Sequence, residues 1–363
     1  MFHRLDLRRA SRVIGLLLVL VLMAGFGAGA QANELILHFL DVGQGGSILI
    51  QTPKGVDILV DAGDDRAGKQ VVLPYLEKMG IESLDMVVMT HPHFDHIGGL
   101  IPVLDRYPVG QILADGQIHT TRTYEDLLTL IYEKGIPFYL ARAGDKLTIP
   151  GLDEVMVLNP MEPFLPGLNN NSVVLKLRYG SIIILLTGDV EAEAEERILA
   201  EASLSKVQIL KAAHHGSKTG STKAFLTAVN PNLAIMSVGA DNVYGLPDEE
   251  ILNRFEEANI QVLRTDLLGT IIVVSDGSSF RIVEPGESLF TESQADGGSR
   301  NGLVNINTAT MEELMELPGI GPTLARRIIQ EREGTPFRKL EDLLRVPGIG
   351  PKRMENLVPL ISF

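Results

Sequence analysis

Three histidines and one aspartate lie within six positions of the segment THPHFDHIGG, residues 90–99, in a chain that has eight histidines and no cysteine. Imidazole and carboxylate groups are suitable ligands for Zn²⁺, Mn²⁺ and iron. The apolar run LDMVVMT, residues 84–90, predicts a strand that ends where these side chains begin. Because His91 and His93 are two residues apart, we expect them to face one ion, whereas Asp95 and His96 can reach a second ion. A surface loop with chance histidines is the alternative, and the density of the cluster disfavours it.

Further ligands must come from distant parts of the chain. Asp189 ends the apolar run IIILLTGD, where an unpaired charge would be costly, so we expect this carboxylate to bridge two ions. His214 and His215 follow another strand run, ILKAA, and adjacent side chains diverge. One of the pair should bind metal while the other faces the substrate or supports a ligand. We assign His214 to the metal and His215, with Asp95, to catalysis. Asp61, after the run DILV, can orient a ligand histidine.

The predicted cofactor is a pair of divalent cations, with Zn²⁺ preferred and Mn²⁺ as the alternative. Two such ions lower the pKa of a water between them and hold the oxygens of a phosphodiester during displacement. A β-lactam or an ester is open to the same attack. The metal site therefore predicts a hydrolase without choosing its substrate.

Composition divides the chain into parts. Short β-branched runs alternate with helical stretches over residues 33–285, which predicts an α/β domain with layers of helices and sheets. Residues 286–302 are polar and rich in Gly and Ser, as expected of a flexible linker. Residues 303–363 carry eight basic and eight acidic side chains, so the formal net charge of −14 resides in the rest of the chain. This different charge balance predicts that residues 303–363 form a separate domain.

The N-terminal 32 residues are typical of a signal peptide. A basic start, FHRLDLRRASR, precedes the apolar run VIGLLLVLVLMAGFGAGA and the small-x-small site Ala30-Gln31-Ala32. We expect cleavage after Ala32 and a secreted or extracytoplasmic protein, with no membrane span after cleavage. An uncleaved single-span anchor is the alternative, since the apolar run is near the lower length limit for spanning a bilayer.

THPHFDHIGG resembles the His-x-His-x-Asp-His signature of the metallo-β-lactamase superfamily. Further segments resemble the extracytoplasmic hydrolase domain of the ComEC competence proteins, namely FLDVGQGGSILI, NNNSVVLKLRYGSIIILLTGD, LKAAHHGSKTGS and NVYGLP. This resemblance covers roughly residues 35–283 and implies a four-layer αββα sandwich with a two-metal site at one edge. It implies metal-site positions at His91, His93, Asp95, His96, Asp189 and the 214–215 histidine pair.

Three departures from the family pattern concern the site. Many members supply another histidine between the signature and the bridging aspartate, and here only His119 lies in that interval. We interpret His119 as a surface histidine, with the segment NNNS, residues 169–172, standing where that ligand would be. Gly46 replaces an aspartate of the family's VGQGD, and Leu246 replaces a histidine of its NxYGHP. These two exchanges predict altered substrate contacts.

The C-terminal region contains an internal repeat. LMELPGIGPTLARRI (314–328) and LLRVPGIGPKRMENL (343–357) align without gaps over PGIGP. The repeat resembles the helix-hairpin-helix motif, and the region resembles the DNA-receptor domain of the ComEA competence proteins, which implies a small all-α (helix-hairpin-helix)2 domain. Glycines let a phosphate approach the backbone, and helix N-termini attract it. A protein-interaction hairpin is the alternative. The residues expected at the DNA backbone are Gly319, Gly321, Arg326, Arg327, Gly348, Gly350, Lys352 and Arg353.

Together these features predict an extracytoplasmic, metal-dependent phosphodiesterase that acts on DNA and is related to competence. The expected partners are DNA, bound without sequence preference, and the competence machinery. A phosphodiesterase for cell-wall phosphocholine or teichoic acid and a non-catalytic extracellular DNA receptor remain alternatives. A β-lactamase is the least favoured reading.

Overall fold

The computed structural model describes residues 33–283 except 205, and residues 304–362 except 318–319, 321, 335–336, 338, 348, 351–353, 355–356 and 358–359. The chain divides into two compact units, residues 1–291 and 292–363. This division falls inside the segment 286–302 that we predicted as a linker. That segment and the predicted signal peptide, residues 1–32, lie outside the described residues.

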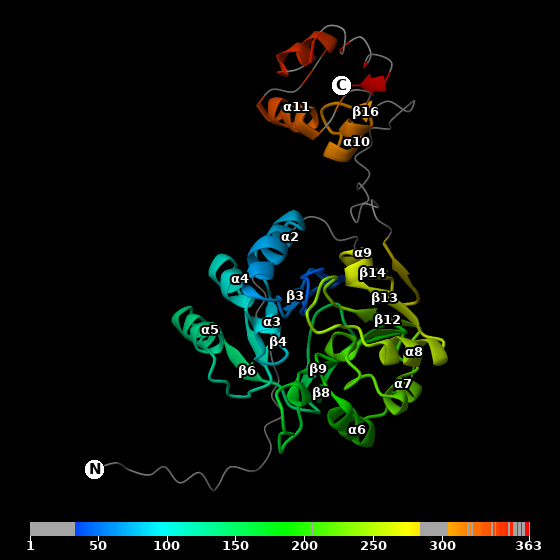
Figure 1. The fold of residues 1–363 in the computed structure, drawn as a ribbon. Helices are drawn as coiled ribbons and strands as arrows, with labels where there is room; N and C mark the ends of the chain where they lie inside the picture. The colour runs from blue at the N-terminus through cyan, green and yellow to red at the C-terminus, as the bar shows by residue number, and fades with distance from the viewer. Residues whose placement is uncertain are drawn as a thin grey trace, which may run out of the picture. The chain divides into compact units, whose positions relative to one another are not determined.

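The first unit contains an eight-stranded sheet with the strand order β15-β14-β1-β2-β3-β4-β5-β6 (Figure 1). Neighbouring strands are antiparallel from β15 to β3 and parallel from β3 to β6. The strands are β1 (Leu35–Phe39), β2 (Ile48–Gln51), β3 (Asp57–Val60), β4 (Met86–Met89), β5 (Ile112–Ala114), β6 (Phe138–Leu140), β14 (Ile271–Ser275) and β15 (Phe280–Ile282).

A second, seven-stranded sheet has the order β13-β12-β11-β10-β9-β8-β7. Its strands are parallel from β10 to β13 and antiparallel from β7 to β10. They are β7 (Lys146–Leu147), β8 (Glu154–Asn159), β9 (Val174–Tyr179), β10 (Ile182–Leu186), β11 (Ile209–Lys211), β12 (Leu233–Met236) and β13 (Gln261–Arg264).

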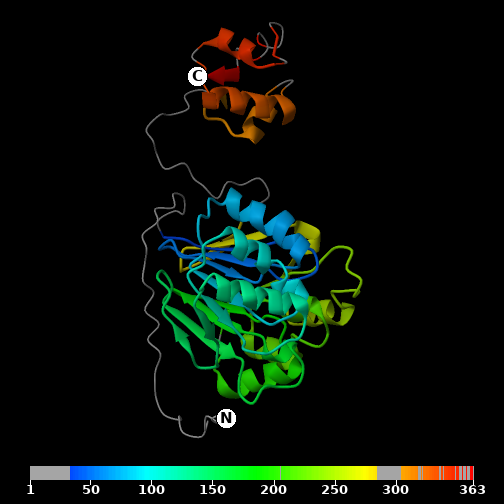
Figure 2. The ribbon, with the colours of Figure 1, turned by 90° about the vertical axis from the view of Figure 1, so that its left-hand side faces the viewer.

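The two sheets pack face to face, and helices cover their outer faces (Figures 1 and 2). Alternate residues of each strand point inward, so Leu35, Leu37 and Phe39 of β1 share one apolar core with Leu175 and Ile184 of the second sheet. This is the four-layer αββα sandwich that we predicted. The helical elements are α1 (Asp65–Ala67), the π-helix η1 (Gly68–Val72), α2 (Leu73–Lys78), α3 (Phe94–Ile97), α4 (Leu100–Arg106), α5 (Arg122–Glu133), the 3-10 helix η2 (Asn169–Asn171), α6 (Ala192–Glu201), the 3-10 helix η3 (Ala213–Gly216), α7 (Lys223–Val229), α8 (Glu249–Glu257) and α9 (Thr265–Leu268).

Each outer helical layer has its own apolar core. Val72, Leu76 and Leu127 of the first layer pack on the outward residues of β2 to β4, in a cluster with Leu49 and Leu59. On the second sheet, a comparable cluster joins α6, α7 and α8 to β10, β11 and β12. The amphipathic helices therefore fix both sheets from outside and leave the ends of the parallel strands free to carry a site.

The C-terminal unit is built from α10 (Met311–Glu316), α11 (Pro322–Gly334) and the 3-10 helix η4 (Leu340–Arg345). α10 begins with a capping box in which Thr310 and Glu313 exchange hydrogen bonds with each other's backbone. The unit has its own buried core, which includes Leu314, Ile328 and Leu343. It is helical as predicted, with one addition: two-residue strands β16 (Val304–Asn305) and β17 (Ile361–Ser362) pair in parallel.

Within the described parts of both units, no helix has the length and the apolar content needed to cross a membrane. The apolar run of residues 13–30 lies outside the described residues.

His38 lies in β1 and is held by side chains of the fold. Its ring is buried, with Nδ1 2.8 Å from the Tyr75 hydroxyl and Nε2 3.1 Å from Gln51 Oε1. Burial lowers the pKa of His38 to about 4, although the hydrogen bond to Gln51 raises it in part. In an unfolded chain the same group titrates near 6.5, so between these values the folded state binds fewer protons.

We therefore expect the first unit to lose stability as the pH falls from about 6.5 towards 4, because only the unfolded chain takes up the His38 proton. From pH 7 to pH 5 the loss assigned to His38 is about 2 kcal/mol. Urea unfolding at both pH values, in chelator, should show a smaller loss for His38→Gln than for the wild type. Equal losses in the two proteins would contradict this assignment.

Candidate metal centre

The polar residues predicted for the site come together at one edge of the sandwich, where parallel strands of both sheets end. Asp61 follows β3, and His91 follows β4, which is its parallel neighbour in the first sheet. Asp189 follows β10, and His215 follows β11, which is its parallel neighbour in the second sheet. The carboxyl ends of parallel strands meet at one edge of a sheet, so each sheet supplies half of this site.

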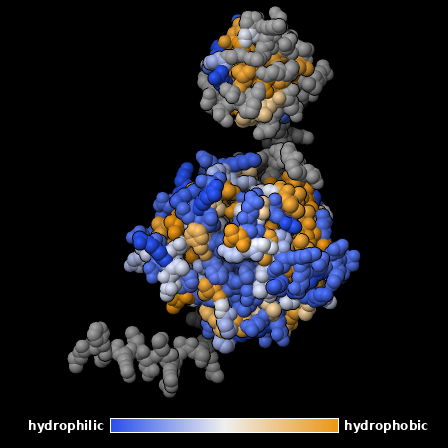
Figure 3. All heavy atoms as spheres, in the orientation of Figure 1, coloured by the Kyte–Doolittle hydropathy of each residue, from blue (hydrophilic) through white to orange (hydrophobic). Residues whose placement is uncertain are grey.

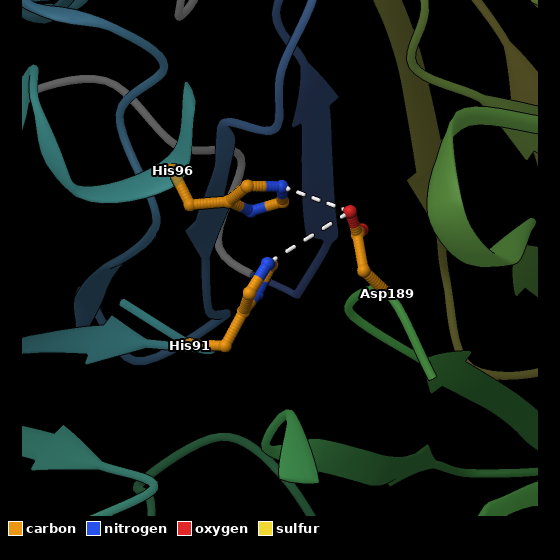
Figure 4. Close-up of side chains that lie close together, drawn as sticks. All are labelled: His91, His96 and Asp189. Carbon is orange, nitrogen blue, oxygen red and sulfur yellow. Dashed lines mark hydrogen bonds and ion pairs between the residues drawn. The ribbon is translucent and has the colours of Figure 1, made fainter. Parts of the chain in front are cut away.

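One carboxylate oxygen lies at the centre of the cluster. Asp189 Oδ2 is 3.2 Å from His96 Nε2 and 3.0 Å from His215 Nε2. It is 4.0 Å from His91 Nε2, and Figure 4 shows His91 and His96 both pointing towards it. All four side chains are buried. Two overlapping groups, His91–His96–Asp189 and Asp95–His96–His215, each place their ligand atoms within 4.8 Å of one another.

Asp95 and His93 lie on the outer side of this cluster. Asp95 Oδ2 is 3.5 Å from His215 Nε2, and 34% of the Asp95 side chain is exposed. His93, which precedes α3, brings Nδ1 to 2.9 Å from His91 Nε2. His93 therefore contacts His91, and Asp95 is the most exposed carboxylate of the cluster. That His91 and His93 share one ion stays a prediction.

Hydrogen bonds at Nδ1, the ring nitrogen that faces away from Asp189, orient His96 and His215. The Nδ1 atom of His96 lies 2.7 Å from Asp61 Oδ2, and Asp61 also accepts hydrogen bonds from the Thr90 amide and hydroxyl. His215 Nδ1 lies 2.8 Å from the carbonyl oxygen of Ser237. A ring nitrogen that donates to an oxygen leaves the other nitrogen free as a ligand, so both rings present Nε2 to Asp189. The position of Asp61 is the one that we expected of an orienting carboxylate.

Lys211 is a residue of the site that our sequence analysis did not identify. Its buried ammonium group lies 3.6 Å from Asp189 Oδ1 and donates a 2.9 Å hydrogen bond to the carbonyl oxygen of Gly188. The available signal was a lysine inside the apolar run VQILKAA. Because a buried lysine needs a partner, its occurrence one strand away from Asp189 indicates compensation of a buried charge.

The charges of the cluster hold Asp189 in its ionised form. Burial raises the pKa of Asp189, but His215, His96 and Lys211 outweigh burial and keep it well below its usual range. Burial also lowers the pKa of His96, but the carboxylates of Asp189 and Asp61 outweigh it and keep that pKa well above its usual range. For His91, burial and the other histidines keep the pKa well below 6.5. The cluster thus pairs the negative charge of Asp189 with a positively charged His96, while the His91 imidazole is neutral.

The donor set fits divalent transition-metal ions. Asp189 Oδ1 is buried and accepts no hydrogen bond. The Nε2 atoms of His96 and His215 face each other at 3.2 Å, where two lone pairs would repel without a proton or a cation between them. Neutral imidazole nitrogens and carboxylate oxygens are the ligands that Zn²⁺ and Mn²⁺ accept. A cation here would therefore satisfy atoms that the protein alone leaves without a suitable partner.

The two histidines of the 214–215 pair point to different places, and the division of roles between them stays a prediction. His214 and His215 both adopt left-handed backbone conformations, with φ of 49° and 54°, which turns their side chains apart. His215 enters the cluster, whereas His214 Nδ1 lies 2.9 Å from Thr219 Oγ1 and its Nε2 lies 3.2 Å from Asn169 Nδ2. The structure places His215 where we expected His214, and His214 is the partly exposed neighbour.

The departures from the family pattern have structural consequences. Ser172 Oγ accepts a 3.2 Å hydrogen bond from the Asp189 amide, so NNNS braces the turn that carries this carboxylate. Gly46 donates its amide to the Asp95 carbonyl, and a Cβ atom at Gly46 would lie 3.1 Å from the His96 ring. His119 lies on a loop outside both ligand groups, with Nδ1 2.9 Å from Thr121 Oγ1.

Few of the predicted DNA contacts lie in described parts of the C-terminal unit. Arg327 is exposed on α11 and donates a 2.6 Å hydrogen bond to the Pro347 carbonyl, and Gly350 is exposed. Arg326 lies on the same helix, but its side chain is not described. The remaining positions lie outside the described residues, namely Gly319, Gly321, Gly348, Lys352 and Arg353.

Comparison with known proteins gives a match for each unit. The family model described as Metallo-beta-lactamase superfamily matches residues 40–240, and the model described as Helix-hairpin-helix motif matches residues 299–362. A solved structure, the metallo-beta-lactamase fold protein YhfI from Bacillus subtilis, has a TM-score of 0.47 and 14% identity, and covers 66% of this chain and 100% of its own.

Curated relatives include proteins of bacterial competence. The chain is 31% identical to ComE operon protein 3 of Bacillus subtilis over 256 residues, which are 66% of this chain and 33% of that protein. It is 31% identical to Competence protein ComA of Neisseria gonorrhoeae over 69% of this chain and 34% of that protein. ComE operon protein 1 of B. subtilis is 42% identical over 67 residues, 17% of this chain and 32% of that protein. The chain thus spans about a third of the length of each of these relatives.

The hydrogen bond between His96 Nδ1 and Asp61 Oδ2 can be tested by substitution. We expect Asp61→Asn to weaken metal binding by about 10- to 100-fold, because the amide no longer orients and polarises the ring as a carboxylate does. Titration of the metal-free protein against a competing chelator measures this change. Asp57→Asn, at the opposite end of β3, is the matched control and should bind metal as the wild type does. Similar affinities for both variants would rule out this role of Asp61.

The histidine pair offers a second test. We expect His215→Ala to lower the number of divalent ions retained per chain, because this variant removes a ring from the buried cluster. His214→Ala should retain the wild-type number, since its ring bonds to Thr219 and Asn169 instead. Elemental analysis after dialysis gives the stoichiometry. The reverse result would restore our sequence-based assignment.

Proposed function

Because this chain belongs to the metallo-beta-lactamase superfamily and carries a helix-hairpin-helix motif at its C-terminal end, we propose that it is a metal-dependent phosphodiesterase that hydrolyses DNA. The observation that carries this proposal is the Asp189 carboxylate, which lies within 3.2 Å of histidines from both halves of the sandwich. A buried carboxylate shared in this way is suited to join two cations.

Two groups of side chains would hold the ions on either side of Asp189. His91 and His93 form one, and Asp95, His96 and His215 form the other. Zn²⁺ is the preferred ion for this nitrogen-rich donor set, and Mn²⁺ is the alternative. When bound, the ions supply a water of lowered pKa and hold the oxygens of a phosphodiester for in-line displacement.

The protein's own groups would position and move protons around that centre. Asp95 is the exposed carboxylate of the cluster, so it is suited to accept the proton of the attacking water. Asp61 and the Ser237 carbonyl keep Nε2 of their histidines directed at the site. Lys211 balances the charge of Asp189 from behind. His214, with 24% of its side chain exposed, would face the substrate.

The C-terminal unit supports DNA as the substrate. In a helix-hairpin-helix motif, glycine-containing turns bring backbone N–H groups at a helix N-terminus towards a phosphate. Such contacts hold DNA without reading its sequence. Curated relatives of both units carry names from competence, which supports the competence machinery as a proposed partner. From the predicted signal peptide, residues 1–32, we propose that the protein acts outside the cytoplasmic membrane.

A cleavage assay tests the proposal. With Mn²⁺ or Zn²⁺, the purified protein should cleave linear or circular DNA, and chelator or Asp189→Asn should lower the rate by at least about 100-fold, since the shared ligand of both ions is lost. Asp153→Asn, a surface carboxylate of the same unit, is the matched control and should keep the wild-type rate.

The other outcomes separate the alternatives. DNA binding without any metal-dependent cleavage would overturn the phosphodiesterase and favour a DNA receptor. Hydrolysis of phosphocholine esters without cleavage of DNA would favour a cell-wall substrate instead.

The role of the C-terminal unit has its own test. We expect Lys352→Ala with Arg353→Ala to weaken DNA binding to a similar degree for all sequences and to reduce the slope of log affinity against log salt by about 2, one for each lost phosphate contact. Lys69→Ala, an exposed lysine of the first unit, should leave the slope unchanged. An unchanged slope in the double variant would show that Lys352 and Arg353 do not contact DNA phosphates.

A further inference from the structure

Several large apolar side chains are exposed on segments that border the metal centre. Phe94 is 52% exposed, Tyr244 70%, Val243 91% and Ile118 88%. The face of the first unit drawn in Figure 3 is largely hydrophilic, with separate hydrophobic patches. Single exposed apolar residues are ordinary on a protein surface, but a group of them around a polar site indicates binding.

Phe94 is part of the metal signature itself. It lies between His93 and Asp95 at the start of α3, so its backbone is part of the segment that carries the cluster. The ring passes over Gly98, where a Cβ atom would come within 2.9 Å of Phe94 Cε2. The glycine therefore gives the ring room to lie over α3 with half of its surface in solvent.

Tyr244 and Val243 belong to a loop, residues 239–247, that is anchored on both sides of the site. At one end, the Gly239 amide donates a hydrogen bond to Gln44 Oε1. Two residues after Gln44, the Gly46 amide donates to the carbonyl oxygen of Asp95. At the other end, Pro247 packs against Gly216, the residue after His215. The loop thus begins beside the Asp95 segment and returns beside His215.

The side chain of Asn242 holds this loop in one conformation. Its Nδ2 donates to the carbonyl oxygens of Gly239 and Leu246, and its Oδ1 accepts from the amides of Tyr244 and Leu246. A loop braced from within loses little conformational entropy when a ligand binds. The hydrogen bonds of Asn242 hold the loop with the side chains of Val243 and Tyr244 in solvent. Exposure of apolar side chains to water is unfavourable for folding.

A third segment completes the surroundings. The 3-10 helix η2 lies beside the histidine pair, because Asn169 Nδ2 is 3.2 Å from His214 Nε2, and the loop that carries Ile118 and His119 is bonded to this helix through Gln117. Gln117 ties this loop to Leu168 and Asn171 by hydrogen bonds of 2.9 Å. A groove of about 450 Å³ runs between the loop that carries Ile118 and residues 164–171. Its lining includes Gln117, Ile118, Phe164, Leu165, Leu168 and Asn171.

We propose that these side chains form a platform for unpaired nucleobases, so that the strand held at Asp189 is single-stranded DNA. This inference rests on the proposed function. A phosphate at the metal centre places its two flanking bases near Phe94 and the 239–247 loop, and each unpaired base offers a face for stacking. In a duplex the same faces are buried. The net charge of −14 gives little attraction for phosphates, so stacking supplies affinity that charge does not.

Binding of phosphorothioate oligonucleotides, which resist hydrolysis, tests the platform. The wild type should bind a single strand more tightly than the matched duplex, and 2-aminopurine in that strand should be quenched by stacking. Phe94→Ala and Tyr244→Ala should each weaken single-strand binding about tenfold and change duplex binding little. Tyr132→Ala removes an aromatic ring of α5 that is 86% exposed, and it is the matched control, expected to change neither.

The results separate this inference from the proposed function. A wild type that prefers the duplex, variants that bind the single strand as the wild type does, or displacement of the strand by phosphocholine would each overturn the platform. Wild-type hydrolysis of DNA and of bis(4-nitrophenyl) phosphate is measured separately. Its absence would overturn the phosphodiesterase, while the binding comparison would still decide the platform. Thermal unfolding of each variant checks that it is folded.

Discussion

The site depends on how the buried charge of Asp189 is balanced. The carboxylate ends a strand of the second sheet, where its ionisation is supported by two histidines and one lysine. His96 reaches it from the first sheet and His215 from the second, so the pairing also ties the two halves together. A charge in this position is stable only while its partners are present. The histidine rings meet at Asp189 Oδ2, and the facing Nε2 atoms of His96 and His215 are the feature that a cation would use.

The architecture explains why such a cluster can form. Apolar cores inside and outside the sheets fix the strands, and the parallel strands then deliver polar residues to a common edge. Groups behind the ligands set the direction of each ring: Asp61 for His96, and the Ser237 carbonyl for His215. The apolar cores thus fix the strands, and short hydrogen bonds at the strand ends orient the site.

Much of this arrangement could be predicted from the sequence, because strong local patterns encode it. Apolar runs such as IIILLTGD specify buried strands, and the density of histidine in THPHFDHIGG indicates metal. The roles of His214 and His215 could not be separated, since both rings follow the same strand and only the left-handed turn decides which one points inward. Lys211 was missed because its partner is distant in sequence. The short strands β16 and β17 form through pairing between residues more than fifty positions apart, which no local pattern reports.

The chain therefore joins a metallo-beta-lactamase unit to a helix-hairpin-helix unit, and the proposed function rests on a two-ion centre at Asp189. Anomalous diffraction from crystals grown with Mn²⁺ tests it most directly. We expect two anomalous peaks about 3.5–4 Å apart on either side of the Asp189 carboxylate, one beside His91 and His93 and the other beside Asp95, His96 and His215. A single peak, or none at this carboxylate, would contradict it.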